Sequence, residues 1–366
     1  MAASEQDPFV YIANYTAGKS DGIRLYRLDR STGELTFVSS TAEGVSNPLY
    51  VQTDPKHRYL FAADHVNECG GVKNGAVSSY AIDTVTGALT HLNQRPSEGT
   101  VPCYVSVARS GRFVFVANYG DGSVAVFPVQ EDGRLAEPSA VVHHAGQGAD
   151  PGRQERAHAH SFLPDPDNRF ALAADLGLDK ILVYRFDATR GTLERAELPF
   201  AAVQDGSGPR HLAFHPDGHW LFVINELDNT IDSFAYDADH GTLKPVHRVA
   251  ALPEGFEGKS YCADLHVHPS GRFLYGSNRG HESIVLYAIA PETGHLSGPK
   301  FEPTRGKFPR GFIIDPSGAF LLVANQESNN VVSFRIDPDT GALGATGHVA
   351  EMPKPVCLAV VPRGKE

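Results

Sequence analysis

The sequence predicts an all-β fold, a seven-bladed β-propeller of four-stranded antiparallel blades. Three observations lead to this prediction. A glycine-containing turn element occurs seven times, an apolar segment ending in Asn or Asp precedes each copy, and the two ends of the chain supply complementary strands. No amphipathic helical pattern of useful length interrupts the series, so we expect residues 1–366 to form a single propeller domain.

The repeated turn is a Gly-x-Leu element whose copies lie 46 to 58 residues apart. Each copy follows a segment that alternates apolar and polar residues, such as GAVSSYAID or KILVYRFD. Alternation next to a glycine-bearing turn is typical of a β-hairpin. The copies begin at Gly33, Gly87, Gly133, Gly191, Gly241, Gly294 and Gly341.

Further upstream, each unit has an apolar run that ends in a short polar residue. Such side chains bond their own backbone in turns, so we expect this position to be structural. Each unit therefore contains four short strands, A to D, within roughly 50 residues, which is the size of a propeller blade. The seven polar residues are Asn14, Asp64, Asn118, Asp175, Asn225, Asn278 and Asn325.

The two ends of the chain complete one blade between them. The C-terminal run VCLAVVP resembles a strand A with nothing after it, and the N-terminal FVYIANY resembles a strand B with nothing before it. Pairing them closes the ring and removes two open sheet edges.

Composition narrows the functional classes. A net charge of -11 argues against a general binder of nucleic acid or anionic membranes. No run approaches the ~20 apolar residues of a membrane span, and the N-terminus lacks the pattern of a signal peptide. The cysteines are widely spaced, which favours reduced thiols. We expect a soluble cytoplasmic protein, and the sequence does not predict its oligomeric state. The cysteines are Cys69, Cys103, Cys262 and Cys357.

We expect site residues at those repeat positions where the residue type differs from blade to blade and which lie at one mouth of the channel. The start of strand A and the end of strand B meet at that mouth, so two columns of residues matter. The first column follows the Asn or Asp of strand B and contains Tyr15, His65, Tyr119, Leu176, Glu226, Arg279 and Gln326. The second begins strand A and contains Leu49, Cys103, His160, Arg210, Ala263, Arg310 and Val356.

These columns predict a catalytic group and a substrate-binding group. The predicted catalytic residues are His160, Glu226, Arg210 and Arg279. The predicted substrate-binding residues are His158, Arg310, Lys307, Tyr119, Gln326 and His65.

Several of these residues have a plainer interpretation. His158 shares a strand face with His160 if the strand begins early enough, but it is equally well explained as a structural histidine. The same pair could bind a metal, yet no third ligand stands out, so we expect no metal and no cofactor. Lys307 is either an anion binder or a solvated basic turn residue.

Three segments resemble a known family. They are GPRHLAFHPDGHWLFVINEL, DLHVHPSGRFLYGSNRGHESI and GKFPRGFIIDPSGAFLLVANQESNNVVSFRID. They are similar to the propeller lactonases, which include bacterial 6-phosphogluconolactonases and fungal 3-carboxy-cis,cis-muconate cyclases, and the resemblance covers nearly the whole chain. The cyclase branch implies a site at His160, Arg210, Glu226 and Arg279, the same four residues, and no catalytic metal.

The favoured hypothesis is a lactonase that hydrolyses an anionic sugar lactone, 6-phosphogluconolactone above all. Arg210, Arg279 and Arg310 would bind carboxylate or phosphate and polarise the ring carbonyl. Either His160 or Glu226 would act as the general base for water. The absence of GxSxG argues against an acyl-enzyme.

Two alternatives stay open. A muconate-type cycloisomerase would use the same four residues, and we prefer the lactonase only because its reaction is the more widespread. A non-catalytic interaction propeller is disfavoured, since the chain lacks the WD dipeptide and such a protein does not require a His, Glu and Arg cluster at the mouth.

Overall fold

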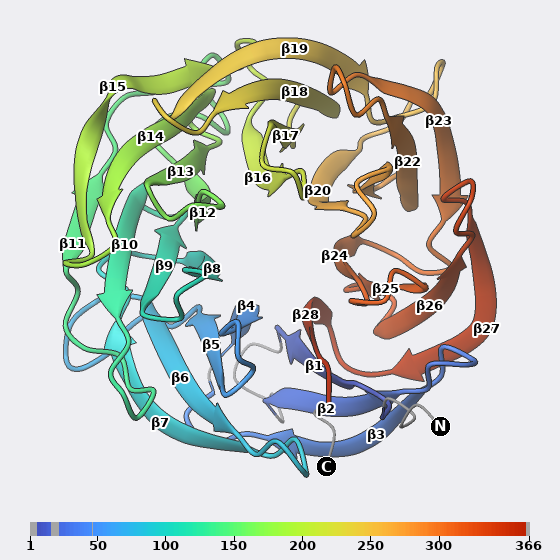
Figure 1. Ribbon diagram of the computed structural model, residues 1–366, viewed down its shortest axis with the longest axis horizontal. Coiled ribbons are helices and arrows are strands. Elements are labelled where there is room, and N and C mark those ends of the chain that lie inside the picture. Colours follow the sequence, from blue (N-terminus) through green and yellow to red (C-terminus); the bar gives the residue numbers. More distant parts are fainter. Residues whose placement is uncertain (1–5, 16–21, 46, 364–366) are drawn as a thin grey trace.

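The computed structural model describes residues 6–15, 22–45 and 47–363, and every regular element in these ranges is a β-strand. Seven four-stranded antiparallel sheets stand around a central axis (Figure 1). The predicted seven-bladed, all-β propeller is therefore confirmed. Among the described residues, no helix is long and apolar enough to cross a membrane. That residues 1–366 form one domain stays a prediction, since both ends lie outside the described ranges.

The blades are numbered along the chain, and the strands of each blade are named in order from the axis outwards. Blade 1 contains β28 (Pro355–Val361), β1 (Phe9–Asn14), β2 (Ile23–Leu28) and β3 (Leu35–Thr41). Blade 2 contains β4 (Pro48–Thr53), β5 (Tyr59–Asp64), β6 (Ala76–Ile82) and β7 (Leu89–Pro96). Blade 3 contains β8 (Pro102–Val107), β9 (Phe113–Asn118), β10 (Ser123–Pro128) and β11 (Ala140–His143). Blade 4 contains β12 (Ala159–Pro164), β13 (Phe170–Asp175), β14 (Lys180–Asp187) and β15 (Thr192–Ala202).

The remaining three blades follow the same order. Blade 5 contains β16 (Pro209–Phe214), β17 (Trp220–Asn225), β18 (Thr230–Asp237) and β19 (Thr242–Ala250). Blade 6 contains β20 (Tyr261–Val267), β21 (Phe273–Arg279), β22 (Ser283–Ile289) and β23 (Leu296–Pro303). Blade 7 contains β24 (Pro309–Ile314), β25 (Phe320–Asn325), β26 (Asn330–Ile336) and β27 (Leu343–Glu351).

The two ends of the chain close the ring as predicted. Strand β28 lies antiparallel to β1, with Phe9 opposite Val361 and Tyr11 opposite Ala359. Both strands are buried along their whole length. The first and last described strands thus protect each other's edges.

Neighbouring blades pack through a repeated glycine–aromatic contact. Each Gly-x-Leu glycine has a positive φ, for example 74° at Gly191, as its tight turn requires. Each also lies against the aromatic ring that begins strand B of the preceding blade, so close that an added Cβ would crowd that ring. The pairs are Phe9–Gly87, Tyr59–Gly133, Phe113–Gly191, Phe170–Gly241, Trp220–Gly294, Phe273–Gly341 and Phe320–Gly33.

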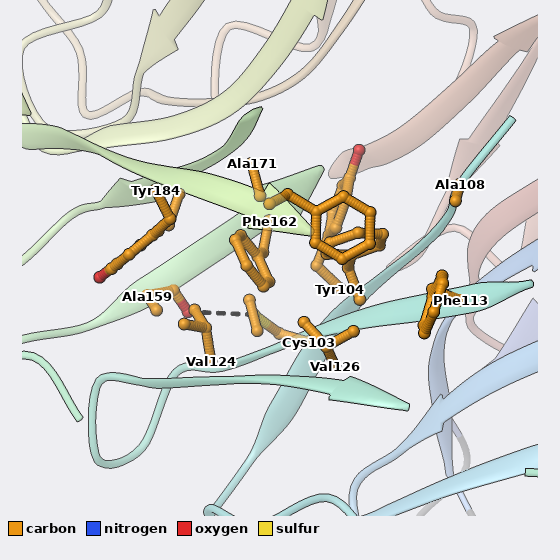
Figure 2. Close-up of a cluster of buried hydrophobic side chains, with 14 of the residues drawn as sticks. Cys103, Tyr104, Ala108, Phe113, Val124, Val126, Ala159, Phe162, Ala171 and Tyr184 are labelled. Carbon is orange, nitrogen blue, oxygen red and sulfur yellow. Dashed lines mark hydrogen bonds between the residues drawn. The ribbon is translucent and has the colours of Figure 1, made fainter. Parts of the chain in front are cut away.

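Apolar side chains fill the space between the blades. Figure 2 shows one such cluster between blades 3 and 4, where Phe162 lies near Val124 and Tyr184. The rings of Phe115 and Phe162 meet edge-on at 5.2 Å between centroids. This tight packing holds the inner ends of the strands that carry the candidate site.

A β-bulge at the start of each strand A determines which residue faces the mouth. In blade 5 the register shifts between Pro209 and His211, so Arg210 is the extra residue. An extra residue disrupts the ladder and redirects its side chain, a device often found beside active sites. The other blades shift at the same place. The column of residues at the start of strand A, which includes His160, Arg210 and Arg310, therefore consists of bulge residues.

Candidate active site

The two columns meet in a cavity of about 330 Å³ at one mouth of the channel. Six members of the column after strand B and five members of the column at the start of strand A line it. Members of both columns therefore face one cavity. Its lining residues are Tyr15, Leu49, His65, Val101, Cys103, Tyr119, Arg153, His160, Arg210, Glu226, Arg279, Arg310 and Gln326.

The carboxylate of Glu226 is the centre of the charged groups. Its Oε2 accepts hydrogen bonds from Nε of Arg210 at 3.0 Å and Nη2 of Arg279 at 2.7 Å. Its Oε1 accepts one from Nη2 of Arg153 at 2.5 Å. The Glu226, Arg210 and Arg279 side chains are almost completely buried, whereas that of Arg153 is 35% exposed. We call these four residues the Glu226 cluster.

The cluster fixes the protonation state of its carboxylate. Burial, the largest single influence, would raise the pKa of Glu226, but the three guanidiniums outweigh it and hold this pKa well below its usual range. The carboxylate therefore stays ionised at neutral pH. Burial and then the charge of Arg279 lower the pKa of Arg210 to about 9, which still leaves the guanidinium cationic at pH 7.

His160 lies on the same cavity and is 5% exposed. Its Nδ1 lies 3.8 Å from Sγ of Cys103, and its Nε2 has no hydrogen-bond partner among the described residues. The ring meets those of Tyr119 and His211 edge-on, at 5.6 and 5.2 Å between centroids. Burial, and next the charge of Arg210, hold the pKa of His160 well below its usual value. This histidine is therefore neutral at pH 7.

A second, deeper layer of polar residues holds Arg210. Its Nη1 donates to the backbone oxygen of Ala263 at 2.5 Å and lies 3.1 Å from Nε2 of His211. Nδ1 of His211 in turn contacts Oδ1 of Asp264 at 2.8 Å. This contact assigns the ring proton to Nδ1, so Nε2 can accept from Arg210. Burial and then Arg210 lower the pKa of His211 to about 4.

Both buried arginines keep an N–H group for a ligand. Arg279 donates from Nε to the backbone oxygen of Tyr261 at 3.2 Å and from Nη2 to that of Cys262 at 2.9 Å. Within the described part of the chain, Nη1 of Arg279 and Nη2 of Arg210 have no acceptor. Each guanidinium is thus held in place while one terminal nitrogen remains available.

Four of the six predicted substrate-binding residues line the cavity, as expected for that role. They are Arg310, Gln326, His65 and Tyr119.

His158 and Lys307 do not line the cavity, so the structure does not bring them to the predicted site. The ring of His158 stacks on Tyr119 at 4.5 Å, and its Nδ1 contacts the Tyr119 backbone oxygen at 2.8 Å. The bulge at His160 interrupts the alternation, so the two histidines do not share a strand face. Lys307 is an exposed turn residue, and its backbone N–H donates to Ser328.

Arg153 is a functional candidate that sequence reasoning missed. It comes from the segment between β11 and β12, the longest connection between two blades and a part of the chain outside the repeat. A buried amide anchors this loop, since Nε2 of Gln154 donates to Asp179 at 2.7 Å and to the Leu176 backbone at 2.8 Å. The sequence did contain a signal for Arg153, namely a basic residue in the longest connection between two blades.

The remaining donor groups do not assemble into a metal site. In the ranges that the structure describes, no three His, Cys, Asp or Glu side chains are placed to hold a metal ion. All four cysteines are free and buried.

Comparison with known proteins agrees with this architecture. The family model described as "Lactonase, 7-bladed beta-propeller" matches residues 9–360. The 6-phosphogluconolactonase of Bacillus subtilis is 37% identical over 306 residues, covering 83% of this chain and 84% of its own length. That of Formosa agariphila is 35% identical over 313 residues, covering 84% and 86%.

A solved structure extends the likeness to three dimensions. The periplasmic gluconolactonase of Pseudomonas aeruginosa superposes with a TM-score of 0.89 at 34% identity, over 98% of this chain and 99% of that one. The family match, the sequence identities and the shared architecture agree. This chain belongs to the seven-bladed β-propeller lactonase family.

Proposed function

We propose that the protein hydrolyses an anionic sugar lactone, 6-phosphogluconolactone to 6-phosphogluconate, by acid–base catalysis without a metal. One observation carries the proposal: a buried neutral histidine faces the same cavity as two fixed guanidiniums that each retain a free N–H group. A neutral base beside preorganised cationic donors is the arrangement that ester hydrolysis by water requires.

His160 is the general base in this proposal. Its Nε2 takes a proton from a water molecule while the water oxygen bonds to the lactone carbonyl carbon. When the tetrahedral intermediate collapses, the bond to the ring oxygen breaks and His160 returns the proton to that oxygen. The product is a hydroxy acid, which loses its carboxyl proton to solvent. Glu226 is a poor base by comparison, because three guanidiniums stabilise its ionised form.

The free N–H groups of Arg210 and Arg279 stabilise the oxyanion that forms on the carbonyl oxygen. Removing one such donor from an oxyanion hole typically costs about 10²–10³ in rate. Glu226 orients both guanidiniums by accepting from each through the same oxygen. It acts as a positioning residue, since its carboxylate is occupied by arginines.

The charge of the cavity supports a metal-independent reaction on an anion. Among the described residues that line it, Arg153, Arg210, Arg279 and Arg310 stand beside a single carboxylate, that of Glu226. Such a surplus of cations repels a divalent metal ion and attracts carboxylate or phosphate.

The named activities of the relatives also support the lactonase. Two relatives with 37% and 35% identity are named 6-phosphogluconolactonase. A third, at 34% identity, is named a periplasmic gluconolactonase. We place this protein in the cytoplasm, because its four free, buried cysteines suit a reducing compartment.

The test is an assay of the purified protein on 6-phosphogluconolactone and on 3-carboxy-cis,cis-muconate, the substrate of the cycloisomerase alternative. Acid release from the lactone, well above its spontaneous hydrolysis, is the expected result. Turnover of the muconate without turnover of the lactone would replace the hydrolase by the cycloisomerase. Turnover of neither would contradict the proposal.

A further inference from the structure

The cavity wall that blades 7, 1 and 2 contribute carries a guanidinium that forms no ion pair with the described residues. Arg310, the bulge residue of β24, lines the cavity but has no hydrogen bond or ion pair with any described residue. The other three arginines of the cavity share the carboxylate of Glu226. Arg310 is half-buried, and a partly desolvated cation that lacks a partner is costly, so its presence at a cavity wall points to a ligand.

A second polar group beside Arg310 also lacks a partner. Gln326 follows β25, in which Asn325 pairs with Pro309, so the two side chains leave the same edge of blade 7. Oε1 of Gln326 is buried and has no hydrogen-bond partner among the described residues. An amide can rotate to present either its oxygen or its nitrogen, so Gln326 can donate to an anion.

Blades 1 and 2 add two aromatic side chains, Tyr15 and His65, which are joined by a hydrogen bond. The hydroxyl of Tyr15 lies 3.3 Å from Nδ1 of His65, and the two rings stack at 5.8 Å. Burial, and next the charge of Arg310, lower the pKa of His65, so this ring is neutral at pH 7. If the Tyr15 hydroxyl donates to Nδ1, the ring proton of His65 lies on Nε2, which has no described partner.

We propose that Arg310, Gln326, His65 and Tyr15 form an anion subsite that holds the phosphate of a phosphorylated sugar lactone. The inference rests on the proposed function, which puts the lactone ring against His160, Arg210 and Arg279 on blades 4, 5 and 6. Both groups of residues line the same cavity of about 330 Å³, so one substrate can contact both. It offers the forked guanidinium and the N–H donors that match a phosphate.

The variant Arg310→Gln tests the subsite by its selectivity. The expected loss of kcat/KM is about 10- to 100-fold on 6-phosphogluconolactone and less than about threefold on glucono-1,5-lactone, which lacks the phosphate. The assay is run near pH 8, where His160 is neutral with or without its cationic neighbour. Because Arg310 has no ion-pair partner in the described part of the chain that its loss would leave uncompensated, the variant is expected to keep or raise the melting temperature.

Two further variants serve as controls for Arg310→Gln. Arg279→Lys disturbs the Glu226 cluster and is expected to lower activity on both lactones alike. Lys307→Gln removes an exposed cation that does not line the cavity, so both activities are expected to stay within about threefold of the parent. An equal loss on both lactones in Arg310→Gln, or no loss on either, would overturn the subsite.

A second measurement is independent of lactone turnover. Inorganic phosphate at tens of millimolar is expected to raise the melting temperature of the parent by mass action, and not that of Arg310→Gln. Equal stabilisation of both proteins, or of neither, would overturn the subsite. A parent that binds phosphate through Arg310 but hydrolyses neither lactone would instead refute the proposed function and leave the subsite standing.

Discussion

The carboxylate of Glu226 is expected to be the most sensitive single group of the cavity. Glu226→Gln keeps the shape of the side chain but leaves Arg210 and Arg279 buried without a counterion. Breaking a buried ion pair by removing one partner typically costs about 3–5 kcal/mol. The contact with Arg153 adds little, because that side chain is 35% exposed and exposed pairs contribute about 0–1 kcal/mol.

This loss corresponds to a measurable shift in melting temperature. Unfolding entropies of about 2.1 cal/mol/K per residue, taken over 366 residues, predict roughly 1.3 °C per kcal/mol, hence a fall of about 4–7 °C. Activity is expected to fall more sharply, by about 10²–10⁴ in kcat/KM, because both oxyanion donors lose the group that orients them.

The assay combines thermal unfolding with steady-state kinetics on 6-phosphogluconolactone, and two variants control it. Glu197→Gln changes an exposed carboxylate of outer strand β15 and is expected to cost less than about 0.5 kcal/mol. Arg153→Gln leaves the buried pairs intact and is expected to cost about 1 kcal/mol or less. The reasoning is refuted if Glu226→Gln unfolds within about 1 °C of the parent and keeps near-normal turnover.

Two further predictions concern metal and pH. Exhaustive treatment with a chelator is expected to leave kcat/KM and folding unchanged, and a loss that one specific divalent ion restores would contradict the metal-free mechanism. His211 has its pKa lowered to about 4 in the folded protein, so the unfolded chain binds a proton that the folded one does not as the pH falls below 6.5. Stability is therefore lost between pH 6.5 and 4, by up to about 3 kcal/mol from this residue, and urea titrations should show a shallower pH dependence in His211→Gln.

The fold and the position of the cavity could be predicted because they follow from a repeat. Seven copies of one turn set the number of blades, and an Asn or Asp that is the last residue of strand B, or the next to last in blade 6, marks the mouth in each. His160 and Arg310 stand out because they occupy the position at the start of strand A, where most other blades have an apolar residue or cysteine. The bulge that redirects them leaves no trace in the sequence beyond the preceding proline in five of the seven blades.

Side-chain partners and irregular segments could not be predicted in this way. Spacing alone puts His158 beside His160, because period-two alternation does not allow for the bulge that the structure has at this point. Arg153 lies in a connection outside the repeat, and only the folded loop shows that it reaches Glu226. Which arginines form ion pairs also depends on contacts across blades. Arg210 and Arg279 share one carboxylate, whereas Arg310 forms no ion pair among the described residues.

The central claim is that neutral His160 activates the water that opens the lactone. The most direct test compares kcat/KM of the parent and of His160→Asn on 6-phosphogluconolactone at neutral pH, with calorimetric binding of 6-phosphogluconate to show that the variant's cavity is intact. Asparagine can form hydrogen bonds but cannot take a proton, so we expect rate losses of about 10²–10⁴ with product affinity largely preserved. Near-normal turnover by the folded variant would contradict the account.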